Sequence, residues 1–232
     1  MSATRACTLS FPLENLYNEH DGDDKVDTNY ILEQLSNRKP AMMGERNYRK
    51  YAILLPLVEQ DKEPHLLFEV RSLKMRSQPG DICFPGGRID ESDKTEEQCA
   101  IRETTEELGI EPSNIHQVQP LDYIIANDGR IIHPFAGKIT TLETLKLNKA
   151  EVAEVFTVPL RYFLETEPKL YKVNLEVVPE PNFPFDLIHN GKDYDWRTRQ
   201  IDELFYLYED RVIWGLTAKI INHFIELIKR GE

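Results

Sequence analysis

The sequence lacks the features of a membrane-inserted or exported protein. No apolar run in its 232 residues approaches the ~20 residues that a membrane-spanning helix needs. Residues 1–25 contain no basic start followed by an apolar core, so we expect no secretory signal. Cys7, Cys83 and Cys99 lack metal-site spacing, and reduced thiols of a cytoplasmic protein are the expected reading.

Positive charge is also scarce. The chain has 40 acidic and 28 basic residues, a net charge of −12, which argues against a broad surface for nucleic acid. A small phosphorylated ligand remains compatible, because a few arginines or a metal ion can neutralise it locally. Hydrophobic residues make up 41% and charged residues 29%, as in an ordinary globular protein, so a mainly disordered chain is not expected.

The chain divides by pattern into an N-terminal appendage (1–47), a core (48–160) and a C-terminal extension (161–232). Apolar runs predict strands at 51–58, 65–70, 123–126, 134–139 and 155–160, and a C-terminal hairpin at 204–208 and 211–214. Apolar periodicity predicts helices at 29–35, 96–108 and 217–229. Strands interspersed with amphipathic helices indicate a mixed α/β domain.

The helix at 96–108 carries the most informative residues. Glu103, Glu106 and Glu107 are spaced i, i+3 and i+4, so they are expected on one face. Three neighbouring carboxylates repel one another, and a hard divalent cation such as Mg²⁺ removes that conflict. The Gly86-Gly87 turn lets the backbone pass close to the helix and its ligand.

The same helix offers structural features. Thr95 with Gln98 makes a capping box, and Gly109 suits the residue after the helix. Ile101, Thr105 and Leu108 are expected to pack on the sheet, as is Cys99, while Arg102 lies where it can orient a carboxylate. A glutamate-rich helix face is most often only solvated, so the spacing of further residues decides the reading.

Residues 86–110 resemble the Nudix box, because Arg102-Glu103, Glu106-Glu107, Gly109 and Ile110 match its pattern in register. Two positions depart from it. Asp93 stands where the pattern has glutamate and lies one residue too far from Arg102, which puts its role in doubt. Thr104 occupies a position that is usually apolar.

The residues before the box resemble the coenzyme A pyrophosphatase branch of this family. Arg71-Ser72, Arg76, Gly80 and Phe84-Pro85-Gly86-Gly87 stand at the spacings of its signature, although Leu67-Phe68-Glu69 replaces Leu-Leu-Thr. Arg71 and Arg76 add the positive charge that a diphosphate with a further 3′-phosphate needs. Ser77 and Gln78 are weaker candidates for the same ligand, and Gly86 and Gly87 are expected at the substrate.

The resemblance implies a Nudix α/β/α sandwich with a mixed sheet and hydrolysis of coenzyme A or acyl-CoA to 3′,5′-ADP and 4′-phosphopantetheine, or its acyl form. Mg²⁺ or Mn²⁺ is the implied cofactor, held by Glu103, Glu106 and Glu107. The general base is Glu103, Glu106 or Glu151, and the residues do not decide which. Glu151 ranks above Glu154, because it lies farther from the following strand.

Three rival functions stay open. They are a Nudix hydrolase for ADP-ribose or a dinucleotide, a catalytically silent nucleotide sensor, and an RNA-decapping enzyme, which the −12 charge disfavours. The sequence at 228–232 has no peroxisomal tripeptide, so cytoplasm is the expected location. Expected partners are a small nucleotide substrate and, through the tail, a second copy in a homodimer, with no nucleic acid and no membrane.

Overall fold

A computed structural model describes residues 28–36, 38–140 and 142–231. The chain divides into two compact units, Met1–Glu45 and Arg46–Glu232, each considered separately. In the first unit the described secondary structure is the helix α1 (Thr28–Ser36), which confirms the helix expected at 29–35. Cys7 lies outside the described residues, and Cys83 and Cys99 are free thiols. In the described part of the chain no helix is long and apolar enough to cross a membrane.

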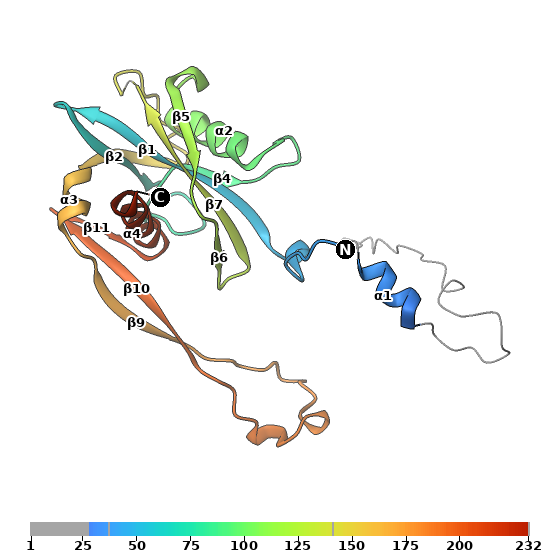
Figure 1. The fold of residues 1–232 in the computed structure, drawn as a ribbon. Coiled ribbons are helices and arrows are strands. Elements are labelled where there is room, and N and C mark those ends of the chain that lie inside the picture. Colours follow the sequence, from blue (N-terminus) through green and yellow to red (C-terminus); the bar gives the residue numbers. More distant parts are fainter. Residues whose placement is uncertain (1–27, 37, 141, 232) are drawn as a thin grey trace. The chain divides into compact units, whose positions relative to one another are not determined.

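The second unit contains strands and helices in alternation (Figure 1). In chain order they are η2 (Glu45–Asn47, shared with the first unit), β1 (Arg49–Gln60), β2 (Glu63–Arg71), β3 (Ile82–Cys83), β4 (Gly86–Arg88), α2 (Glu96–Leu108), η3 (Pro112–Asn114), β5 (Ile115–Pro120), β6 (Ile124–Ala126), β7 (Arg130–Ile139), β8 (Val152–Pro159), α3 (Leu160–Glu165), β9 (Lys169–Leu175), η4 (Phe185–Leu187), η5 (Gly191–Asp193), β10 (Arg199–Tyr208), β11 (Arg211–Trp214) and α4 (Gly215–Arg230).

The main sheet is mixed. Its order is β3-β2-β1-β7-β5, with β4 paired to β1, β6 to β7 and β8 to β2. β1 and β7 run parallel and the other described pairs run antiparallel. β1 and β2 form a hairpin that turns at Asp61 and Lys62, both with positive φ. The polar residues between the two apolar runs predict a turn at this place.

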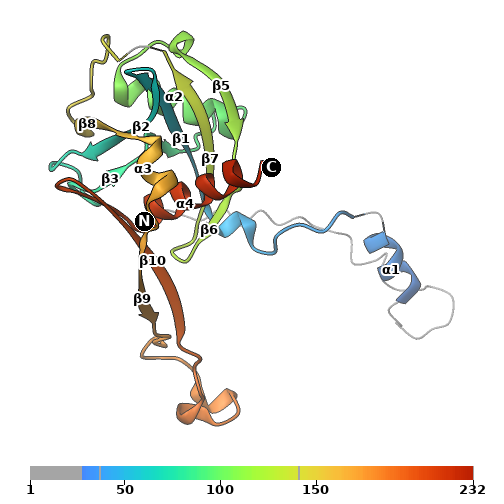
Figure 2. The same cartoon turned by 60° about the vertical axis from the view of Figure 1, so that its left-hand side comes forward.

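Alternating side chains give this sheet two apolar faces, covered by different helices (Figure 1 and Figure 2). Leu54 and Leu67 pack against Leu108 of α2 on one face. Leu55 and Phe68 belong to the cluster on the other face, which α3 and α4 cover. The expected α/β/α sandwich with a mixed sheet is therefore confirmed, and each fully buried Leu or Phe contributes ~1.5–3 kcal/mol to its stability.

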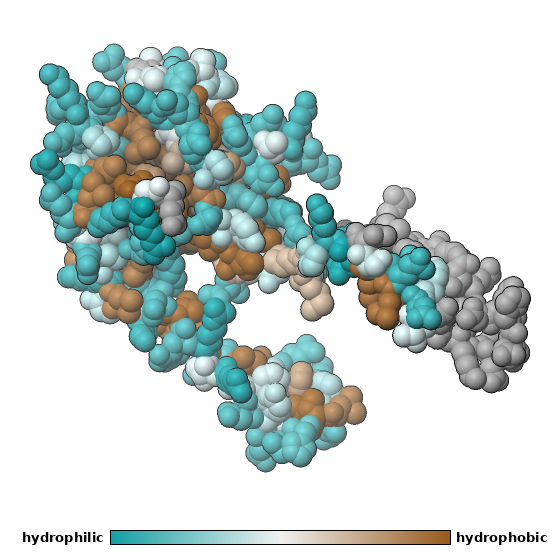
Figure 3. Space-filling model, viewed as in Figure 1, coloured by the Kyte–Doolittle hydropathy of each residue, from teal (hydrophilic) through white to brown (hydrophobic). Residues whose placement is uncertain are grey.

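The C-terminal extension forms a second, three-stranded sheet in the order β11-β10-β9. Its hairpin turns at Glu209 and Asp210, and α4 follows, so both C-terminal predictions are confirmed. β9 was not anticipated, nor were β5 and α3, because they are short or have no clear apolar alternation. Apolar residues of β9 are exposed, among them Leu170 and Tyr171, and brown atoms interrupt the hydrophilic surface there (Figure 3).

The extension is tied to the main sheet through α4. Thr217 Oγ1 donates to the backbone oxygen of Ile82 in β3 at 3.0 Å. β3 is the short strand that follows the segment from Arg71 to Gly80. The C-terminal helix thus anchors the part of the chain that carries the candidate substrate residues.

Gly109 and Gly129 offer a test of the fold. Both have positive φ, 64° and 78°, but a Cβ at Gly109 would overlap the backbone of Lys146, whereas a Cβ at Gly129 meets nothing within 4 Å. Gly129→Ala should cost the ~1–2 kcal/mol of a left-handed alanine, and Gly109→Ala should cost clearly more. Urea denaturation measures both, and equal losses would contradict the packing around Gly109.

Candidate active site

Both ends of α2 are capped, which fixes the register of its glutamates. Thr95 Oγ1 accepts the N–H of Gln98 at 3.1 Å, and Gly109 closes the helix by donating its N–H to Thr105 O at 2.9 Å. Gln98 Oε1 reaches back to the N–H of Lys94 at 3.1 Å, one residue before the expected one. These bonds satisfy groups that a helix end leaves unpaired. The helix at 96–108 is confirmed.

The packing face of α2 includes most of the expected residues and also Thr104 and Glu107, which were not expected. Its buried residues are Cys99, Ala100, Thr104, Glu107 and Leu108. Leu108 and Cys99 are buried as expected and half-buried Ile101 packs against the same cluster, whereas Thr105 is only half-buried and is absent from it. Thr104 tolerates full burial because its hydroxyl donates to Ala100 O at 2.7 Å within the helix.

Glu107 is a buried carboxylate held by the glycine turn. Its side chain is in the buried face of α2, and its Oε2 accepts the N–H of Gly86 at 2.8 Å. The pKa of Glu107 is raised to about 8, chiefly by burial and also by the charges of Glu103 and Glu151, against the lowering effect of this bond. A cation near Glu107 would remove this penalty.

Glu103 lies directly over the backbone of Gly87, so close that a Cβ on Gly87 would overlap its carboxyl group. Its Oε1 pairs with Arg102 Nη1 at 2.7 Å. Partial burial raises the pKa of Glu103, and Arg102 opposes that shift. The absence of a side chain at Gly87 thus makes room for a carboxylate at the turn.

Arg102 organises the outer side of the cluster. Its Nε and Nη2 donate to the two oxygens of Asp93 at 2.9 and 2.8 Å, and its Nη1 lies 3.3 Å from Glu106 Oε2. Hydrogen bonds from Arg102 and from the Asp90 N–H lower the pKa of Asp93. Asp93 therefore holds the turn and Arg102, while the Glu106 side chain is 56% exposed.

Glu69 is a further buried acid at the site, and sequence reasoning gave it no role. It is 2% exposed, and its Oε1 has no hydrogen-bond partner within the described residues. Strand alternation places Glu69 and Arg71 on the same face as Leu67, beneath α2. Burial raises the pKa of Glu69 well above its usual value, and Glu107 adds to the rise. Counting alternate residues from Leu67 would have found it.

Glu151 approaches the same cluster from the loop before β8. Its backbone oxygen accepts the N–H of Ser72 at 2.7 Å, which ties this loop to the end of β2. Its charge raises the pKa values of Glu69, Glu103 and Glu107. Glu154, the lower-ranked alternative, forms an ion pair with Arg211 instead.

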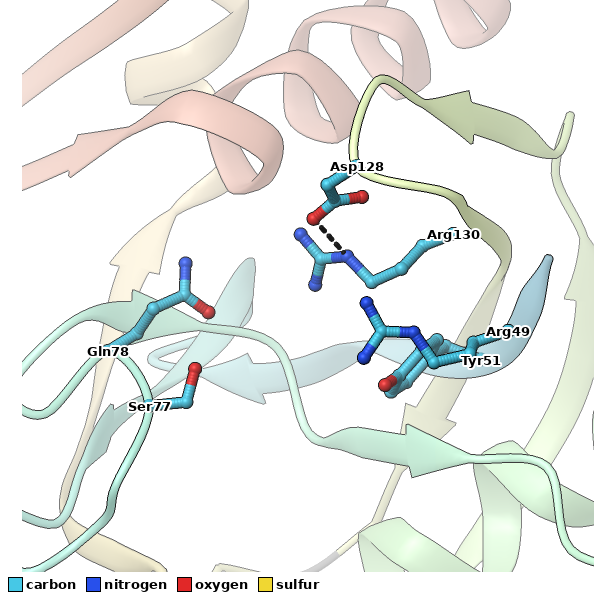
Figure 4. A pocket seen from close by; sticks show the side chains of 6 residues that line it. All are labelled: Arg49, Tyr51, Ser77, Gln78, Asp128 and Arg130. Atoms are coloured by element: carbon cyan, nitrogen blue, oxygen red, sulfur yellow. Dashed lines mark ion pairs between the residues drawn. The ribbon is translucent and has the colours of Figure 1, made fainter. Parts of the chain in front are cut away.

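The two arginines of the candidate substrate segment are placed differently. Arg71 is half-buried at the end of β2, where its charge opposes the raised pKa values of Glu69 and Glu107. Its Nε donates to Ser77 O at 3.4 Å. Arg76 is exposed, and within the described residues no ion pair holds it. Ser77 lines a separate polar cavity rather than the carboxylate cluster (Figure 4).

Within the described residues, no group of three or more acidic, histidine or cysteine side chains stands ready to hold a metal ion. Protein donors already occupy the expected ligands, since Arg102 pairs with Glu103 and Glu106 and the Gly86 N–H bonds to Glu107. The donor set still fits a hard divalent cation. Burial raises the pKa values of Glu69, Glu103 and Glu107, and neighbouring carboxylates add to each rise, so a cation bound among these oxygens would stabilise their charged forms.

Comparison with known proteins identifies the family. The sequence matches the NUDIX domain over residues 48–180. The chain belongs to the Nudix hydrolases, a family that generally uses divalent metal ions.

Two curated relatives support the assignment. The chain is 38% identical over 173 residues to the mouse peroxisomal coenzyme A diphosphatase NUDT7, a match that covers 72% of this chain and 66% of that protein. It is 31% identical over 196 residues to an uncharacterised Nudix hydrolase, NudL, of Photorhabdus laumondii, covering 84% and 94%. A solved Ap4A hydrolase of C. elegans matches 49% of this chain and 81% of its own at 21% identity, with a TM-score of 0.41.

The raised pKa of Glu107 predicts how stability depends on pH. The folded state favours the protonated form of Glu107. The contribution of Glu107 to the free energy of unfolding is therefore fully present below pH 4.5 and is lost as the pH rises toward about 8. In EDTA, each pH unit in this interval should cost up to ~1.4 kcal/mol per proton released. Glu107→Gln, which can still accept the Gly86 N–H, should reduce the slope in a pH series of urea unfolding curves. Glu97→Gln, which changes an exposed acid in the first turn of α2, is the control and should keep the wild-type slope; a reduced slope there would contradict the assignment.

Gly87→Ala should separate activity from stability. The added Cβ meets only the flexible carboxyl end of Glu103, so the fold should tolerate it while Glu103 is displaced. Misplacing a catalytic group can cost ~10²-fold in rate, and we expect a loss of that order with little change in Tm. Gly86→Ala should behave oppositely and lower Tm, since its Cβ would strike the backbone of Ala52 and Ile53 at a φ of 150°. Unchanged turnover in Gly87→Ala would exclude a role for this placement of Glu103.

Proposed function

We propose that the chain hydrolyses the diphosphate bond of coenzyme A or an acyl-CoA to 3′,5′-ADP and 4′-phosphopantetheine or its acyl form. One observation carries the proposal. The branch signature begins at Arg71, whose guanidinium acts on the carboxylate cluster, and ends at the Gly86-Gly87 turn, which contacts Glu103 and Glu107. The mouse relative is named a coenzyme A diphosphatase, which supports the proposal.

The residues divide the chemistry between charge and proton transfer. Glu103, Glu106 and Glu107 would hold Mg²⁺ or Mn²⁺, which when bound supplies positive charge for the diphosphate oxygens and acidifies the attacking water. Arg71, on the same face of the sheet, would bind a diphosphate oxygen, and exposed Arg76 would add charge at the rim. The Gly86-Gly87 backbone leaves room for the substrate to approach these groups.

Glu151 is the favoured general base. Glu103 and Glu106 are both paired with Arg102, which occupies one carboxylate oxygen of each. Within the described residues the Glu151 side chain forms no ion pair, and it comes from a loop that bonds to the end of α2, where the Asn148 N–H donates to Glu107 O at 2.9 Å. It can therefore take the proton as water attacks one phosphorus in line.

The expected cytoplasmic location stays a prediction. The name of the mouse relative places that protein in the peroxisome. Fluorescence microscopy of the tagged protein, with the tag at either end in turn, would decide between the two compartments.

A direct comparison of substrates tests the function. With Mg²⁺ or Mn²⁺, kcat/KM for coenzyme A should exceed that for ADP-ribose and for a dinucleoside polyphosphate, and EDTA should abolish hydrolysis. Glu106→Gln should lower kcat by ~10²-fold or more. Glu97→Gln is the matched control, because Glu97 is an exposed acid in the first turn of the same helix. Mass spectrometry should identify 3′,5′-ADP among the products.

Each rival gives a different result in this experiment. A preference for ADP-ribose or a dinucleotide would overturn the substrate assignment and leave the metal-dependent hydrolase intact. Binding without turnover of any substrate would support the catalytically silent sensor. Wild-type rates in Glu106→Gln would mean that this acid is only a surface charge.

A further inference from the structure

The polar cavity that Ser77 lines is on the opposite face of the main sheet from the carboxylate cluster. It has a volume of about 200 Å³ and is lined by Arg49, Tyr51, Ser77, Gln78, Asp128 and Arg130 (Figure 4). Arg49 and Tyr51 alternate with Ala52 and Leu54 along β1, so they lie on the face away from α2. The mechanism above gives this cavity no role.

Two arginines stand side by side on one wall. Arg49 and Arg130 are register partners on the parallel strands β1 and β7. Arg130 Nε pairs with Asp128 Oδ2 at 2.7 Å, and its guanidinium lies 5.8 Å from the centre of the Tyr51 ring. Within the described residues the Arg49 side chain has no ion pair. Two guanidinium groups against one carboxylate leave the wall with a net positive charge.

The facing wall belongs to the branch signature. Ser77 and Gln78 present a hydroxyl and an amide toward the arginines (Figure 4). Arg71 fixes this loop, because its N–H donates to Asp81 O at 2.9 Å and its backbone oxygen accepts the N–H of Gly80 at 3.0 Å. One short loop therefore connects the diphosphate side, at Arg71, with the cavity, at Ser77 and Gln78.

The two sites also share one end of the sheet. Arg49 begins β1, Arg130 begins the parallel strand β7, and Arg71 ends the antiparallel strand β2. β4, which carries Gly86 and Gly87, pairs with β1 at Tyr51–Ile53 beside the cavity. A ligand that lies across this end can contact the carboxylate cluster with one group and the paired arginines with another.

We propose that this cavity binds a phosphate monoester on the nucleoside half of the substrate. Arg49 and Arg130 bind the phosphate, and Ser77 and Gln78 donate hydrogen bonds to it from the loop. Guanidinium groups bind phosphate through paired, charge-assisted hydrogen bonds, and a dianion relieves the repulsion between two neighbouring arginines. Tyr51 supplies an aromatic surface next to that phosphate. The inference rests on the proposed function and identifies the residues that select a 3′-phosphorylated substrate.

The test compares Arg49→Gln with wild type on coenzyme A and on 3′-dephospho-coenzyme A. Arg49 is exposed, so the variant should fold. Its kcat/KM for coenzyme A should fall ten- to a hundred-fold, the range for a lost charge-assisted hydrogen bond, with at most a two- to threefold change for the dephospho substrate. Arg46→Gln is the control, since Arg46 is an exposed arginine outside the cavity lining, and it should leave both values unchanged.

A binding measurement keeps this proposal separate from the proposed function. By calorimetry in EDTA, wild-type protein should bind 3′,5′-ADP at least tenfold more tightly than 5′-AMP, and Arg49→Gln should abolish the difference. Equal losses on both substrates, or equal affinities for both nucleotides in wild type, would overturn the cavity assignment. Failure to hydrolyse coenzyme A together with tight 3′,5′-ADP binding would overturn the proposed function and support the cavity.

Discussion

The close passage of the Gly86-Gly87 backbone between β1 and α2 is the constraint on which the site depends. Gly86 lies against the backbone of Ala52 and Ile53 and donates its N–H to Glu107, while Gly87 gives its side-chain space to Glu103. Any larger residue would push the strand, the helix or a carboxylate out of place. The turn thereby couples the position of β4 in the sheet to the position of two acids on α2.

Charge compensation explains the rest of the arrangement. The outer acids, Asp93, Glu103 and Glu106, share Arg102, whereas the inner acids, Glu69 and Glu107, have Arg71 and one backbone N–H nearby, and burial raises the pKa of both. One guanidinium cannot neutralise three outer acids, so both halves keep negative charge that a cation would offset. Such a site releases protons when a cation enters, because the cation competes with them for the same oxygens.

The sequence predicted the parts of the fold that depend on local patterns. Helix α2, its caps, the β1–β2 hairpin and the C-terminal hairpin follow from periodicity and turn residues, and all are confirmed. The burial of Thr104 was not predicted, because its hydroxyl bonds to Ala100 O within the helix and the residue can therefore be buried. β1 and β7 are far apart in the chain. No local pattern could therefore predict that their pairing makes Arg49 and Arg130 neighbours.

The bond between Thr217 and Ile82 has a consequence for motion. It joins the strand after the Arg71–Gly80 loop to the helix that ends the described chain, so loosening that helix also releases one anchor of the loop. Local opening in proteins occurs in cooperative units rather than bond by bond. Amide hydrogens in the first turn of α4 and in β3 should therefore exchange with solvent as one unit, although more than 130 residues separate them along the chain.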